Sequence, residues 1–143
     1  KAELDSRVEI EYETYAKEIN IEAKAMIDIA AKQIIPAVIK YTTVLAQSIN
    51  AVKSACGADI SAQTEILTEV SDLLADAQNA LDKLKDVTEK ASAMDEGREQ
   101  AVYYRDTVKT AMDELRAPVD KLEMLVDKSM WPMPSYGDLI FEV

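Results

Sequence analysis

One stretch decides the fold: residues 7–54 read RVEIEYETYAKEINIEAKAMIDIAAKQIIPAVIKYTTVLAQSINAVKS. Its apolar side chains recur in steps of three and four residues, which matches the ~3.6-residue turn of an α-helix. The stripe consists of Val8, Tyr12, Tyr15, Ile19, Ala23, Met26, Ala30, Ile34, Val38, Tyr41, Leu45, Ile49 and Val52. We therefore expect one amphipathic helix, roughly 70 Å long at about 1.5 Å per residue.

Pro36 lies inside this stripe but does not change its phase. A proline nitrogen cannot donate to the carbonyl four residues earlier, here that of Lys32. The sequence therefore predicts a kink at Pro36, with the helix continuing beyond it.

Two shorter stripes follow, each after a turn. At the first turn, Gly57 suits a left-handed residue at a helix end, and Asp59 or Ser61 suits the N-cap of the next helix. The second stripe includes Ile66, Val70, Leu73, Ala77, Leu81, Leu84, Val87 and Ala91, and the third includes Ala101, Tyr104, Val108, Met112, Leu115, Val119, Leu122 and Val126, with Pro118 as a second kink. We expect helices at about 5–55, 60–92 and 97–129.

Short turns between successive helices favour antiparallel neighbours. The predicted fold is all-α: an elongated, antiparallel, up-down-up bundle of three long helices at residues 1–130, the first helix being the longest. Because the first helix exceeds its partners, roughly its first 18 residues should project beyond the bundle. Tyr12, Tyr15 and Ile19 would then form an apolar stripe without a partner.

The last thirteen residues, 131–143, read WPMPSYGDLIFEV and end the helical pattern. Two prolines favour an extended backbone, and the segment contains the only Trp and the only Phe of the chain. We predict an extended docking tail. Trp131 would form either a lid over the open end of the bundle or a clamp onto another domain or subunit. The predicted interface residues are Tyr12, Tyr15, Ile19, Trp131, Tyr136, Leu139 and Phe141.

Composition limits the partners of the chain. The net charge of −11 disfavours nucleic acid and anionic membrane surfaces. No uninterrupted apolar run approaches the roughly 20 residues that span a bilayer. Cys56 is the only cysteine, which excludes an internal disulfide and fits a cytoplasmic protein.

The sequence offers little catalytic chemistry. Because histidine is absent, Ser-His and Cys-His nucleophile pairs and histidine-ligated metals are excluded. Carboxylates at helical spacing, such as Glu9 with Glu13 and Glu18 with Glu22, lie off the apolar stripe and fit a solvated face. We predict no catalytic, cofactor-binding or metal-binding residue in this chain.

Several stretches together resemble the C-terminal region of type III glutamine synthetases, across nearly the whole chain. The most specific is WPMPSY at 131–136 followed by DLIF at 138–141, although Ser135 stands where Thr is also common. The other stretches are residues 6–23 (SRVEIEYETYAKEINIEA), 35–38 (IPAV), 103–106 (YYRD), Ala111-Met112 and Leu115-Arg116.

This resemblance implies a parent enzyme that joins ammonia to glutamate with ATP and a divalent metal, Mg or Mn, in large rings of subunits. No catalytic motif of the family matches a position here. The chain, which starts without Met inside a helical pattern, is expected to be a fragment: a non-catalytic C-terminal helical domain that contacts an upstream catalytic domain and neighbouring subunits. The alternative is a free-standing helical interaction or oligomerisation module without an enzymatic parent.

Overall fold

The computed structural model describes the backbone of residues 2–133 and the side chains of residues 11–133. All regular secondary structure in this part of the chain is helical. The prediction of an all-α protein is confirmed.

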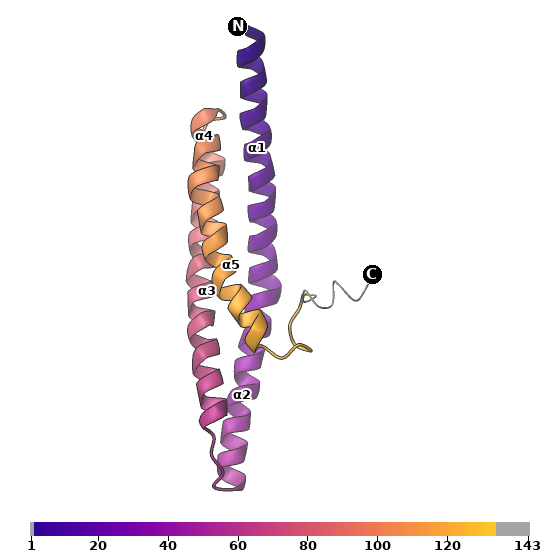
Figure 1. Ribbon diagram of the computed structural model, residues 1–143, viewed down its shortest axis with the longest axis vertical. Helices are drawn as coiled ribbons and strands as arrows, with labels where there is room; N and C mark the ends of the chain where they lie inside the picture. The colour runs from indigo at the N-terminus through magenta and orange to yellow at the C-terminus, as the bar shows by residue number, and fades with distance from the viewer. Residues whose placement is uncertain (1, 134–143) are drawn as a thin grey trace.

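The first helical rod has three parts: α1 (Ala2–Ile29), the π-helical turn η1 (Ala30–Ile34) and α2 (Ile35–Ala55). Figure 1 shows them as one long continuous helix. The Ile35 N–H donates to the Ala30 carbonyl, five residues earlier, so the π-turn ends directly before Pro36. A π-turn widens the helix by one residue, which provides room where the proline ring would otherwise meet a carbonyl. The predicted kink at Pro36 stays a prediction.

The second rod is α3 (Ser61–Ala93), and the third comprises α4 (Arg98–Tyr103), the π-turn η2 (Tyr104–Val108) and α5 (Lys109–Leu125). In Figure 1, α3 returns alongside the first rod, and α4 to α5 run back along α3. The contacts of α3 with α5 and with α2 are the most extensive between helices.

The turn between α2 and α3 differs from the prediction at Gly57. Among the described residues only Gly97 has a positive φ, at 144°, so Gly57 is not left-handed. Instead, Cys56 ends α2 in an extended conformation, with φ −160° and ψ 175°. The N-cap of α3 is Ile60, without a side-chain cap bond, so the predicted N-caps Asp59 and Ser61 were both wrong by one residue. The Asp59 Oδ1 accepts the Ser61 N–H at 3.0 Å and the Ser61 hydroxyl at 2.6 Å.

The core is a ladder of aliphatic side chains from all three rods. Leu81 and Leu84 of α3 and Leu115 and Leu122 of α5 are the largest fully buried side chains, together with Val38 on the first rod. Many of the remaining core positions are alanines, which let helix backbones approach closely. The buried alanines are Ala16, Ala23, Ala30, Ala77, Ala91, Ala101 and Ala111.

The free end of α1 is shorter than predicted. Ala16 and Ile19 are buried within the chain, Ile19 to 5% exposure. The Tyr104 hydroxyl donates to Asn20 Oδ1 at 3.2 Å, which ties α1 to the third rod. Figure 1 still shows α1 extending beyond α4. The prediction of about 18 projecting residues was wrong. The helices α3 and α4 contact α1 closer to its N-terminus than the predicted helix lengths implied.

The third rod ends at Leu125, earlier than the predicted residue 129. Val126 is extended, with φ −73° and ψ 142°. Because α5 ends beside the middle of the first rod, the turn end of the molecule consists of α2 and α3 alone (Figure 1).

One helix is long and apolar enough, by length and composition alone, to cross a membrane. The expectation from uninterrupted apolar runs did not predict this. The helix Glu11–Ala55 contains an 18-residue window with a mean hydropathy of 1.2, of which 22% is buried within the chain. The 18-residue window can contain two charged residues, whereas an uninterrupted apolar run contains none, and this difference explains why the helix was not predicted. By length and composition alone this signal is weak, because core helices of soluble proteins and signal sequences pass the same test.

Candidate functional site

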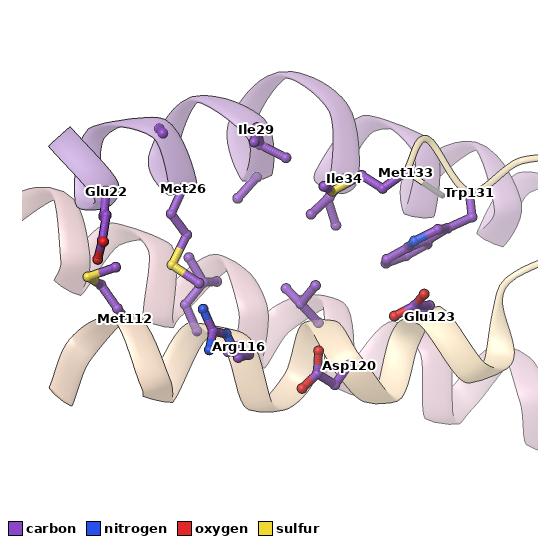
Figure 2. Close-up of a pocket in the computed structure, with 14 residues that line it drawn as sticks. Glu22, Met26, Ile29, Ile34, Met112, Arg116, Asp120, Glu123, Trp131 and Met133 are labelled. Atoms are coloured by element: carbon purple, nitrogen blue, oxygen red, sulfur yellow. The ribbon is translucent and has the colours of Figure 1, made fainter. Parts of the chain in front are cut away.

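An apolar groove of about 580 Å³ lies between the first rod and α5. Figure 2 shows the two helices as its walls, with Trp131 at one end. Its floor is formed by Met26, Ile29 and Ile34 from the first rod and by Met112, Leu115 and Val119 from α5. The volume falls within the range of about 300–1,000 Å³ that is typical of ligand pockets.

The groove exists because α5 packs chiefly on α3, with far less contact to the first rod. Leu115 and Leu122 are fully buried. On the opposite wall the first rod presents Ala25 and Ala30 beside larger apolar side chains. Packed helices normally lie about 8–10 Å apart with interdigitating side chains, and the limited contact between α5 and the first rod leaves a groove between them.

A tight turn after α5 places Trp131 at the end of the groove. Asp127 Oδ1 accepts the Ser129 N–H at 2.8 Å and the Ser129 hydroxyl at 2.7 Å. The Asp127 carbonyl accepts the N–H groups of Met130 at 2.9 Å and Trp131 at 3.1 Å. The bonds from Ser129 stabilise the carboxylate and hold the pKa of Asp127 below its usual value. Trp131 consequently packs against the bundle core.

The rim of the groove is mostly acidic. Glu22 lies on the α1 side, and Asp120 and Glu123 lie on the α5 side (Figure 2). Arg116 is the only basic residue among those that line the groove. The groove thus combines an apolar floor with a net negative rim.

A second, polar cavity of about 290 Å³ lies between α1 and the start of the third rod. At the edge of this cavity, Lys17 Nζ lies 3.0 Å from Glu13 Oε1. The hydrogen bond that Lys17 donates to the Glu13 carboxylate raises the pKa of Lys17. The bond between Tyr104 and Asn20 forms part of its wall. These contacts stabilise the helices that form the cavity. The residues that line the cavity include no nucleophile with an adjacent base.

The predicted interface residues have different environments. Tyr12 and Tyr15 are half-buried, and Tyr15 packs against the core. Ile19 is already covered by the chain's own helices. Trp131 is half-buried at one end of the groove between the first rod and α5, and its role as lid or clamp stays a prediction. Tyr136, Leu139 and Phe141 lie outside the described residues.

The described ionisable side chains form no group of three or more that could hold a metal ion. Cys56 is exposed after the end of α2. The ion pairs Lys32–Asp28 and Lys90–Asp86 are one-turn pairs on exposed helix faces, the kind that contributes little to stability. Within the described part of the chain, no arrangement supports acid–base or nucleophilic chemistry.

Sequence reasoning missed the groove. Met26 and Met112 were assigned to the apolar stripes of two different helices, and Arg116 was noted only within the family resemblance. The stripes alone carry no signal for a groove between the two helices. Only the assembled helices reveal that these positions face each other.

Comparison with known proteins identifies relatives along the whole chain. The family described as "Glutamine synthetase C-terminal domain" matches residues 1–53. A glutamine synthetase of Butyrivibrio fibrisolvens is 35% identical over 144 residues, covering 100% of this chain and 21% of the relative. The chain belongs to the glutamine synthetase family.

Two further glutamine synthetases agree with this assignment. The enzyme of Bacteroides fragilis (strain YCH46) is 27% identical, covering 99% of this chain and 20% of the relative. The type-3 glutamine synthetase of Dictyostelium discoideum is 28% identical, covering 97% of this chain and 20% of the relative. The predicted resemblance to glutamine synthetases is confirmed, and the chain spans about a fifth of the length of these curated relatives.

Proposed function

We propose that the chain is the non-catalytic helical C-terminal domain of a type III glutamine synthetase. In this role it provides structure and subunit contacts to an enzyme that joins ammonia to glutamate at the expense of ATP. The family assignment and the all-helical fold support this proposal.

The uncovered surface of the first rod carries the proposal. The most apolar window of the helix Glu11–Ala55 is only 22% buried within the chain. Ile21, Ile39 and Val44 are 67%, 49% and 47% exposed. An apolar helix surface of this extent is typical of a protein or membrane contact. The net charge of −11 favours a protein over an anionic membrane surface.

The chemistry of the parent enzyme is assigned to upstream sequence. ATP and a divalent metal, Mg or Mn, require clustered oxygen ligands and groups that bind phosphate. Among the described residues, no group of three or more acidic or cysteine side chains could hold a metal ion. We infer a role in assembly for this chain, with the upstream catalytic domain and neighbouring subunits as partners in the cytoplasm.

The proposed contacts use the end of α1 and the exposed side chains of the first rod. Tyr12 and Tyr15 lie near the free end of α1, where half-exposed aromatic rings suit an interface. Ile19 is buried within the chain near the same end of α1. The tail residues Tyr136, Leu139 and Phe141, with Trp131, keep their proposed role as docking residues, on this bundle or on another domain or subunit.

The double substitution Ile39→Gln with Val44→Gln in the full-length enzyme tests the assembly role. We expect smaller particles by light scattering and a parallel loss of glutamine formation, because half-exposed apolar anchors contribute more than about 1 kcal/mol each at an interface. The melting temperature of the isolated 143-residue chain should change by less than about 3 °C, since both side chains are already solvated there.

Gln47→Ala, an exposed polar position on the same helix, is the matched control and should leave particle size and activity unchanged. Native particle mass and native activity in the double variant would refute an assembly role for this surface.

The alternative is a free-standing module that self-associates through the same apolar surface. A reading frame upstream of Lys1 with several hundred residues of synthetase sequence would exclude it. Stable oligomers of the isolated chain at micromolar concentration would favour it.

A further inference from the structure

We propose that residues 134–143 of the tail fill the groove between the first rod and α5 of the same chain. Trp131 and Met133 already line one end of this groove (Figure 2), so the tail leaves the described structure at the groove itself. Such docking does not depend on whether the chain is part of a larger enzyme.

The tail is long enough to follow the whole groove. From Ile34 to Glu22 the groove spans twelve helical residues, which corresponds to about 18 Å. The ten residues after Met133 reach about 33 Å when extended. Starting from Met133, Tyr136 reaches the middle of the groove and Leu139 reaches its far end, near Met112 and Arg116.

The chemistry of the tail matches the groove floor. Tyr136, Leu139, Ile140 and Phe141 give the segment a high apolar content, and the floor consists of methionine and aliphatic side chains. Methionine adapts its shape to neighbouring side chains and contacts aromatic rings favourably. Burial of the tail side chains that face the groove floor drives the docking.

Charge limits how the tail can lie. Asp138 and Glu142 would be repelled by the acidic rim of Glu22, Asp120 and Glu123. In an extended segment, successive side chains alternate in direction. In a fully extended tail, Leu139 and Phe141 would therefore face the groove, while Asp138 and Glu142, and with them Tyr136 and Ile140, would face the other side.

The tether favours the chain's own tail over other occupants. The tail is joined covalently to residues that already line the groove, which gives it an effective concentration in the millimolar range there. Within one chain, no translational freedom is lost on docking.

Disulfide trapping tests the proposal. In a Cys56→Ser background, Arg116→Cys on the groove side of α5 is combined with Leu139→Cys in the tail, and the 143-residue chain is oxidised at low micromolar concentration. The matched control combines Leu139→Cys with Ala117→Cys, an exposed neighbour that does not line the groove. We expect the intrachain disulfide to form in at least about five-fold higher yield with Arg116→Cys, because only that pair lies within bonding distance.

The other outcomes overturn the proposal. Equal intrachain yields for the two positions, or none for either, would mean that the tail does not occupy the groove. Disulfide-linked dimers as the main product would mean that a second copy fills it.

The fluorescence of Trp131 gives an independent readout, because it is the only tryptophan. In Leu139→Asp, with unchanged helical circular dichroism, acrylamide quenching of Trp131 should rise about two-fold as the groove loses its cover. Glu142→Gln, on the solvent side of the docked tail, should leave quenching unchanged. Equal quenching in both variants and the unsubstituted chain would contradict docking.

Discussion

At the residue scale, Asp127 determines where the chain goes after its last helix. Its side chain and its carbonyl together accept four hydrogen bonds from Ser129, Met130 and Trp131. These bonds turn the backbone so that Trp131 packs against the core. A carboxylate can hold two donors on one oxygen more strongly than a neutral acceptor can.

The depressed pKa of Asp127 predicts a specific pH dependence. A group whose pKa is lower in the folded state stabilises the fold above its unfolded pKa of about 3.9 and loses this effect as the pH falls through the folded value. We expect Asp127→Asn to lower the melting temperature at pH 7 and to approach the unsubstituted chain near pH 3. Asp113→Asn on α5 controls for the loss of one charge. A difference between Asp127→Asn and the unsubstituted chain that stays constant over this pH range would contradict the assignment.

Single residues also show where sequence reasoning stops. Asp59 was predicted as a possible N-cap of α3; the N-cap is Ile60, and Asp59, one residue earlier, accepts local hydrogen bonds from Ser61. Gly57 was assigned a left-handed conformation, but an extended Cys56 ends α2 without requiring one. Ile19 was expected outside the bundle, and its burial depends on how far other helices reach along α1. Local hydrogen bonds can be predicted from neighbours in sequence, and burial by distant helices cannot.

At the element scale, the two π-turns show how long helices accommodate irregular positions. The turn η1 directly precedes Pro36, whereas Pro118 lies buried inside the regular helix α5. The turn η2 places Tyr104 and Val108 in the core. Apolar periodicity predicted the helices themselves, because the stripes keep their phase. It contained no signal for the π-turns, which depend on packing against the other rods.

The contrast between the two prolines predicts unequal effects of substitution. Pro118→Ala should raise the free energy of unfolding by about 1–2 kcal/mol, since an interior proline costs about 3 kcal/mol and loss of its buried ring offsets part of that gain. Pro36→Ala should change it by less than about 1 kcal/mol, because η1 already accommodates the ring. Urea denaturation of both variants measures this difference, and a larger gain from Pro36→Ala would contradict the role of η1.

At the scale of the whole molecule, three rods of unequal reach leave surfaces that one chain does not cover. The third rod ends beside the first rod before that rod reaches its α2 end (Figure 1), and 22% of the most apolar window of the first rod is buried within the chain. Composition and periodicity predicted the all-helical class, and specific stretches such as WPMPSY predicted the family. The groove between the first rod and α5 arises from facing positions about ninety residues apart, such as Met26 and Met112. Its existence depends on tertiary packing, which a single amphipathic pattern does not encode.

The central claim is that the exposed apolar surface of the first rod is covered in the intact glutamine synthetase. Hydroxyl-radical footprinting of Ile21, Ile39 and Val44 measures this directly when the isolated chain is compared with the full-length enzyme. Leu84, fully buried within the chain, gives the protected baseline in both. We predict that the labelling of the three exposed residues falls by about three-fold or more in the full-length enzyme, as for side chains at the core of an interface. Equal labelling in the two proteins would contradict the account.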